Sequence, residues 1–130
     1  MGKLFGTDGA RGIANETLGC ETAVRIGRAA AAVLSHPGRP ARVLIGKDTR
    51  RSSDMLEAAL IAGLCSVGAD VVTLGVLPTP AVACLTAEQG ADAGIMISAS
   101  HNPPAYNGIK LFTAGGRDAV EDVTNEIGAE

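Results

Sequence analysis

The sequence predicts an α/β fold in which a mostly parallel, mixed sheet lies between two layers of helices. Three short apolar runs rich in β-branched residues, at positions 42–46, 71–74 and 94–97, are typical of strands. They alternate along the chain with segments whose apolar residues repeat at helical spacing. Because these runs show no polar face, we expect them to be buried on both sides, as in a parallel sheet. This alternation predicts a three-layer α/β/α sandwich.

Three helices are expected, one before the first of these strands and two between them. The first spans residues 23–34 and is ended by the turn-forming sequence at 36–38 (His-Pro-Gly). The second begins at one of three capping residues, Ser-Ser-Asp at 52–54, and continues to residue 67, where a glycine follows. The third covers about 80–88, because its proline is tolerated in a first helical turn.

The C-terminal part of the sequence predicts a hairpin and then an interrupted domain. Residues 109–112 are expected to form a fourth strand, because Asn107-Gly108 is a strong signal for a tight turn. A further helical pattern begins at Asp118, and the sequence stops at Glu130 with no strand to close the domain. We therefore expect residues 1–130 to be a single domain that is incomplete at its C-terminus.

Composition argues against several classes of function. The formal net charge is −3 and aromatic residues make up 2%, whereas nucleic-acid-binding domains carry a basic face and stacking aromatics. No apolar run approaches the ~20 residues that cross a bilayer, and the N-terminus lacks a signal peptide's apolar core, so a cytoplasmic protein is expected. The three cysteines form no Cys-x-x-Cys pair, which argues against zinc, and Cys65 and Cys84 are expected to be buried.

Ser100 and His101 are the first candidates for chemistry. They follow the strand at 94–97, in a loop stiffened by Asn102 and Pro103-Pro104. A serine hydroxyl needs a neighbouring base or a metal to act as a nucleophile, and His101 could be that base. The alternatives are a turn-forming serine and a loop histidine bonded to the backbone.

Lys110 interrupts the apolar pattern of the strand at 109–112. It is either a solvated strand residue or a cation that the hairpin returns toward the serine loop. In the second case it could neutralise phosphate oxygens.

Two further segments suit an anion. Residues 5–12 (Phe-Gly-Thr-Asp-Gly-Ala-Arg-Gly) combine glycines with Arg11, and residues 46–53 place cations, Arg50 among them, at a helix N-terminus. The second segment suits an ordinary capped helix equally well. Because ligands gather at the carboxyl ends of parallel strands, we expect this cluster to lie close to the one at 98–102.

Together these segments resemble the α-D-phosphohexomutase family over the whole chain. The matching motifs occur in the family's order: Phe-Gly-Thr-Asp-Gly-Ala-Arg-Gly at 5–12, Gly-Lys-Asp-Thr-Arg at 46–50, Leu-Pro-Thr-Pro at 77–80, Ser-Ala-Ser-His-Asn-Pro at 98–103 and Tyr-Asn-Gly-Ile-Lys at 106–110. Ile-Ala-Asn at 13–15 is similar to the branch that interconverts glucosamine 6-phosphate and glucosamine 1-phosphate.

The resemblance implies a role for particular residues. Ser100 matches the serine that is phosphorylated and passes its phosphoryl group to the sugar, giving a bisphosphate whose other phosphate returns to the serine. His101 and Lys110 match acid/base candidates, and Arg11 matches an active-site arginine. The substrate- and phosphate-binding residues implied are Thr7, Asp8, Gly9, Arg50 and Asn102.

The resemblance also implies parts that this sequence lacks. Family members have four domains, and Mg²⁺ is held by the phosphate on the serine, here Ser100, together with aspartates of an Asp-Gly-Asp-x-Asp-Arg loop in the second. No Asp-x-Asp occurs here, so the chain alone is expected to be inactive. A phosphomannomutase or phosphoglucomutase, and a non-catalytic phosphosugar-binding module, are the alternatives. An uncovered apolar face predicts self-association or domain swapping.

Overall fold

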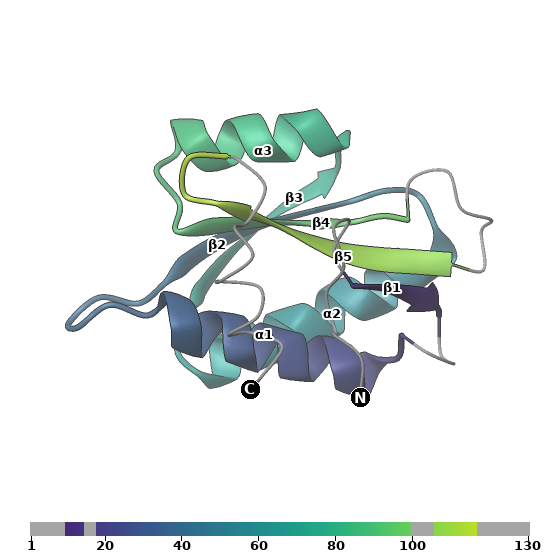
Figure 1. Ribbon diagram of the computed structural model, residues 1–130, viewed down its shortest axis with the longest axis horizontal. Helices are drawn as coiled ribbons and strands as arrows, with labels where there is room; N and C mark the ends of the chain where they lie inside the picture. The colour runs from purple at the N-terminus through teal and green to yellow at the C-terminus, as the bar shows by residue number, and fades with distance from the viewer. Residues whose placement is uncertain (1–9, 15–17, 100–105, 117–130) are drawn as a thin grey trace.

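The computed structural model describes residues 10–14, 18–99 and 106–116. Its elements follow one another as β1 (Ala10–Ile13), α1 (Cys20–Leu34), β2 (Arg42–Lys47), α2 (Arg51–Ser66), β3 (Asp70–Val76), α3 (Thr79–Glu88), β4 (Ala93–Ile97) and β5 (Tyr106–Thr113). Figure 1 shows α1 and α2 on one face of the sheet and α3 on the other. The predicted three-layer α/β/α arrangement is confirmed.

The sheet has five strands in the order β1-β5-β4-β2-β3. Strands β2, β3 and β4 are parallel, and β5 is antiparallel to both β4 and β1. Four strands therefore point the same way and only β5 is reversed, which agrees with the predicted mostly parallel, mixed sheet. The carboxyl ends of β2 and β4 lie next to each other, beside the start of β5.

Two apolar cores stabilise the layers. The larger lies under α1 and α2 and includes Ile45, Ile95 and Ile109, all fully buried. The smaller lies between the sheet and α3. There α3 packs so closely on β4 that a Cβ on Gly94 would lie 2.0 Å from Oγ1 of Thr86, so this strand position requires glycine.

Asn107-Gly108 is not a turn, and this prediction was wrong. Both residues lie inside β5, where Asn107 is opposite Gly12 and Gly108 is opposite Arg11 in β1. An Asn-Gly hairpin turn needs positive φ at both residues. Here the side chain of Asn107 is fully buried and held in the sheet by hydrogen bonds, so the local preference is overruled. The strand β1 itself lies in a segment that the sequence predicted as a loop.

Three smaller predictions also need correction. The run at 71–74 is not buried on both sides, because it lies in β3 at the edge of the sheet, where every residue is exposed or half-buried. Helix α2 begins at Arg51, and its N-cap residue, Arg50, makes no capping bond with its side chain. Cys65 and Cys84 are exposed, not buried. Their neighbours in sequence are apolar, but each cysteine lies on the outward side of its helix, because neighbouring helical residues point about 100° apart.

The helical pattern that begins at Asp118 lies outside the described residues. Within the described ranges, none of the helices is long and apolar enough to cross a membrane.

Candidate functional site

The two polar clusters expected at the carboxyl ends of the strands meet there in their described parts. Lys47, the last residue of β2, is opposite Ile97, the last residue of β4. The contact between the two segments extends one residue beyond β2, since the backbone N–H of Asp48 donates to the carbonyl of Ile97 at 3.1 Å. Ser98 donates its own backbone N–H to the carbonyl of Gly108 in β5 at 2.9 Å. Three segments distant in sequence thus converge at this edge.

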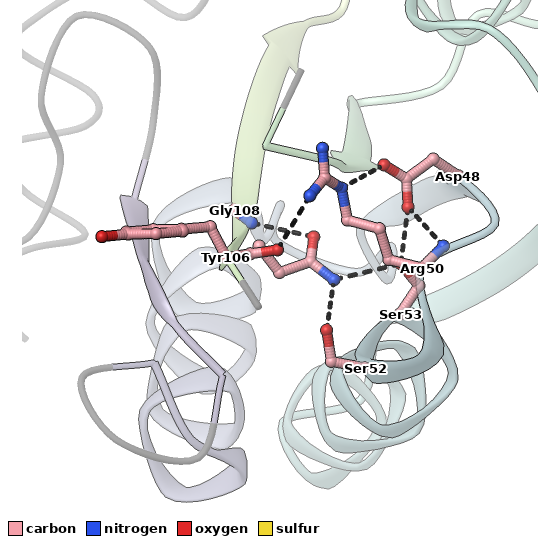
Figure 2. Close-up of polar contacts among 7 residues, drawn as sticks. Asp48, Arg50, Ser52, Ser53, Tyr106 and Gly108 are labelled. Carbon is pink, nitrogen blue, oxygen red and sulfur yellow. Dashed lines mark hydrogen bonds and ion pairs between the residues drawn. The ribbon is translucent and has the colours of Figure 1, made fainter. Parts of the chain in front are cut away.

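Asp48 is the centre of a hydrogen-bonded network at this edge (Figure 2). Its Oδ1 accepts from the backbone N–H of Arg50 at 3.0 Å and from the hydroxyl of Ser53 at 2.9 Å. Its Oδ2 accepts from Nε of Arg50 at 2.9 Å. The side chain of Ser98 is also among the groups that lower the pKa of this carboxyl. Both oxygens therefore have partners, which come from the start of α2.

The surroundings of Asp48 keep it ionised. Burial by itself would raise the pKa of its carboxyl, because a charged group loses hydration. Hydrogen bonds from the backbone of Arg50 and from the side chains of Ser53, Ser98 and Arg50 outweigh that effect, and the pKa lies below its usual value. A charged acceptor strengthens each of these bonds.

Asn107 extends the network into β5. Its Nδ2 donates to the hydroxyl oxygens of Ser52 at 2.8 Å and of Ser53 at 3.1 Å, and its Oδ1 accepts from the backbone N–H of Gly108 at 2.9 Å. Asn107 and Ser53 are both fully buried. A buried amide whose oxygen and nitrogen are both bonded fixes the position of β5 relative to α2.

Arg50 connects the same two elements by a second route. Its Nη1 donates to the backbone carbonyl of Tyr106, the first residue of β5, at 3.2 Å, while its Nε is bonded to Asp48. The side chain of Arg50 is 13% exposed. Two donor nitrogens of Arg50 thus bond to Asp48 and to the start of β5. The contact of Arg50 with phosphate stays a prediction.

Lys47 is balanced by acids of α2. Its Nζ forms ion pairs with Asp54 and with Glu57, the latter at 3.1 Å. The hydrogen bond to Asp54, and then that to Glu57, raise the pKa of Lys47. The sequence allowed two interpretations of residues 46–53, an anion site and an ordinary helix start. The contacts of Lys47 favour the second.

Two of the predicted catalytic residues fall on strands. Lys110 lies on β5, opposite Met96 of β4, and its Nζ is 5.6 Å from the centre of the Phe112 ring. Because Met96 and Phe112 belong to the core under α3, Lys110 is on the α3 side of the sheet. Arg11 lies on β1, and its backbone is in register with Gly108, two residues before Lys110.

The remaining predicted site residues lie outside the described residues. They are Thr7, Asp8, Gly9, Ser100, His101 and Asn102. Ser98 and Tyr106, whose positions are described, flank the segment that contains Ser100.

The comparison with known proteins can be set beside this geometry. The family model "phosphoglucomutase/phosphomannomutase, alpha/beta/alpha domain I" matches residues 2–130. The chain belongs to this family. The sequence resemblance to phosphohexomutases is thereby confirmed.

Curated relatives carry a more specific name. The phosphoglucosamine mutase of Moorella thermoacetica is 61% identical over 127 residues, which make up 98% of this chain and 29% of that protein. The phosphoglucosamine mutase of Clostridium perfringens is 59% identical over the same length, covering 28% of that protein. The chain therefore spans less than a third of the length of these relatives.

A solved structure supports the fold of this phosphohexomutase domain. The crystal structure of a phosphoglucomutase/phosphomannomutase family protein from Burkholderia thailandensis matches with a TM-score of 0.82 at 32% identity. The match covers 95% of this chain and 28% of that one.

Sequence reasoning missed two residues of the network. Asp48 stands two positions before Arg50, the spacing at which an aspartate accepts from the backbone N–H in an Asx-turn, and this spacing could have identified it. Asn107 alternates with Ile109 and Leu111, which places all three on one face of a strand. That period of two outweighs the Asn-Gly turn signal, and the burial of all three residues agrees with it.

The described residues do not form a metal centre on their own. Within 10–14, 18–99 and 106–116 there is no group of three or more His, Cys, Asp or Glu side chains that could hold an ion. Asp48, which follows β2 at the carboxyl end of the sheet, is bonded through both oxygens to protein donors.

Proposed function

We propose that the chain is the first domain of a phosphoglucosamine mutase, an isomerase that interconverts glucosamine 6-phosphate and glucosamine 1-phosphate. The observation that carries this proposal is 61% identity, across nearly the whole chain, with a protein of that name. The relatives' activity belongs to proteins more than three times as long, so the activity proposed here is that of a four-domain protein of which residues 1–130 are one part. Its product would supply amino-sugar nucleotide and cell-wall precursor synthesis in the cytoplasm.

Ser100 is the proposed carrier of the phosphoryl group. The bond between phosphorus and Oγ of Ser100 breaks as a bond to a sugar hydroxyl oxygen forms, and the hydroxyl proton passes to a base. The bisphosphate then turns over, and its other phosphate returns to Oγ. Such transfer depends on positioning and charge neutralisation more than on covalent activation.

His101 and Lys110 are the proposed acid/base groups, a role that typically contributes ~10²–10⁴-fold in rate. Arg11 is proposed to stabilise the transferring phosphoryl group as a catalytic residue. Thr7, Asp8, Gly9, Arg50 and Asn102 are proposed to bind the substrate or its phosphates.

Magnesium is the proposed cofactor, with the phosphate on Ser100 as this chain's ligand. The described side chains do not fit a complete magnesium site, which requires about six oxygen ligands. The aspartates that complete it are proposed to come from a second domain. We therefore predict that the isolated chain has no mutase activity with magnesium and glucosamine phosphate, and turnover at an enzymatic rate would contradict this.

Phosphate mapping on the full-length protein tests the proposal. Intact mass is measured before and after incubation with glucosamine 1,6-bisphosphate, and the modified residue is mapped. One phosphate, on Ser100, is the expected result. A phosphate elsewhere, or none, would leave Ser100 a structural loop residue and favour a phosphosugar-binding module.

A comparison of substrates tests the sugar. The full-length protein is expected to turn over glucosamine phosphate faster than glucose or mannose phosphate. The reverse order would favour a phosphoglucomutase or phosphomannomutase. Self-association of the isolated chain also stays a prediction, and a monomer at high concentration in light scattering would contradict it.

A further inference from the structure

We propose that Asp48 is a positioning residue for the phosphoryl-carrying segment. It fixes both ends of residues 99–105 to the start of α2, and it acts on the reaction through that segment without touching substrate. This inference rests on the proposed function of Ser100. It assigns a role to a carboxylate that the proposed chemistry itself does not use.

The first end is held through the backbone of Asp48. Its N–H donates to the carbonyl of Ile97, the last residue of β4, at 3.1 Å. The next residue, Ser98, is held to β5, because its own backbone N–H donates to the carbonyl of Gly108 at 2.9 Å. Asp48 therefore contacts the end of β4 three residues before Ser100.

The second end is held at Tyr106 and Asn107. Arg50, whose Nε is bonded to Oδ2 of Asp48, donates from Nη1 to the carbonyl of Tyr106. Ser53, whose hydroxyl donates to Oδ1 of Asp48, accepts from Nδ2 of Asn107 at 3.1 Å. These two connections pass through the same carboxylate, while a third, from Nδ2 of Asn107 to the hydroxyl of Ser52 at 2.8 Å, does not (Figure 2).

A carboxylate is the only side chain of this size that fits the position. All the groups that contact it through N–H or O–H are donors, so the position needs an acceptor at both oxygens. An asparagine would offer one acceptor and would direct its NH₂ group toward a donor, either Nε of Arg50 or the Ser53 and Arg50 N–H pair. The Asp48→Asn change keeps the size of the side chain and disrupts at least one of the two connections.

Position alone is enough to change the rate. A displacement of about 1 Å in a reacting group lowers turnover by ~10²-fold, because in-line transfer depends on near-attack geometry. A positioning role therefore predicts a lower kcat per phosphorylated active site. Partial unfolding would lower the amount of active protein and leave turnover per phosphorylated active site unchanged.

The experiment uses the full-length protein and compares Asp48→Asn with Asp92→Asn. Asp92 is a matched control: it is also ionised, it also contacts an arginine and a backbone N–H, and it lies at the other end of β4. We expect Asp48→Asn to lower kcat per phosphorylated Ser100 by ~10²-fold. Asp92→Asn is expected to leave kcat within about twofold.

A second variant, Ser53→Ala, addresses a failure of Asp48→Asn to fold. It removes the hydroxyl that joins Asp48 to Asn107 and is expected to lower kcat by about tenfold, since the connection through Arg50 remains. Unchanged kcat in Ser53→Ala together with an unchanged or unfolded Asp48→Asn would overturn the proposal, as would an equal loss in Asp92→Asn. A wild-type protein that carries no phosphate on Ser100 and no mutase activity would refute the proposed function itself. An active wild type with no effect of Asp48→Asn refutes only the positioning role.

Discussion

The two ends of the parallel strands each hold an aspartate in a similar bonding pattern but in different surroundings. At the carboxyl end, Asp48 accepts from the backbone and the guanidinium of Arg50. At the amino end, Asp92 precedes β4 and accepts from the backbone N–H of Arg42 at 2.8 Å, from Nη1 and Nη2 of Arg39, both at 3.2 Å, and from Nε2 of His36 at 2.9 Å.

The partners of the two aspartates differ in burial. Arg39 and His36 are 55% and 46% exposed, whereas Arg50 is 13% exposed and Ser53 is fully buried. Asp48 itself is 24% exposed and Asp92 is 12% exposed, so the contrast lies in their partners. Solvent weakens the bonds from the exposed Arg39 and His36 more than those from the mostly buried Arg50 and the buried Ser53. The same residue type therefore fastens a surface turn at one end and determines the positions of whole segments at the other.

The largest expected effect comes from the buried member of the network. Asn107→Ala removes the partner of the Gly108 N–H and of two serine hydroxyls, and unsatisfied buried groups are costly. We expect the free energy of unfolding of the chain to fall by about 3 kcal/mol in urea titration. Gln89→Ala, which removes an exposed acceptor of Arg42 near the other end, is expected to change it by less than about 0.5 kcal/mol. If Asn107→Ala lowered the free energy of unfolding by less than about 1 kcal/mol, the contrast between the buried network and the exposed end would be contradicted.

The next effect separates the two arginines. Arg50→Ala leaves Asp48 without its guanidinium and frees the carbonyl of Tyr106, so we expect a loss of about 2 kcal/mol. Arg39→Ala removes an exposed partner of Asp92 and is expected to cost about 0.5 kcal/mol. Thermal unfolding of both variants measures the difference, and equal shifts in Tm would mean that burial of the partners does not matter here.

The pH dependence of stability tests the bonding of Asp92 at the amino end of the strands. Burial alone would raise the pKa of Asp92, but bonds from Arg42, Arg39 and His36 outweigh it and lower the pKa from 3.8 to about 2. Because the folded pKa lies below the unfolded one, Asp92 contributes stability above about pH 4 that is lost as pH falls toward 2. After allowance for solvent around its partners, we expect this contribution to be on the order of 1 kcal/mol.

The measurement is the free energy of unfolding of wild type and of Asp92→Asn between pH 2 and pH 6. The difference between them is expected to shrink as pH falls. A difference that stays constant across this range would show that the charge of Asp92 is not what stabilises the turn.

The sequence was sufficient for the layers and insufficient for the network. Long helical and strand patterns, such as residues 23–34 and 94–97, reflect burial of many side chains at once, so they predict elements reliably. Strand β1 has only four residues and depends on its pairing with β5, a long-range contact that no local pattern reports. For the same reason, the local signal of Asn107-Gly108 predicted a turn, although the partners of Asn107 lie more than fifty positions away.

The smallest predicted effect uses salt to compare the same two arginines. Raising the ionic strength from 0.1 to 1 M shortens the Debye length from about 10 to about 3 Å, which screens exposed charges far more than buried ones. The loss caused by Arg39→Ala is expected to fall from about 0.5 kcal/mol toward zero at high salt, because Arg39 is more than half exposed. The loss caused by Arg50→Ala should keep most of its size, since two of the donor nitrogens of Arg50 bond to groups inside the network. If salt reduced both losses in the same proportion, the Asp48 cluster would be solvated like the Asp92 cluster and could not hold β5 against α2 by excluding water.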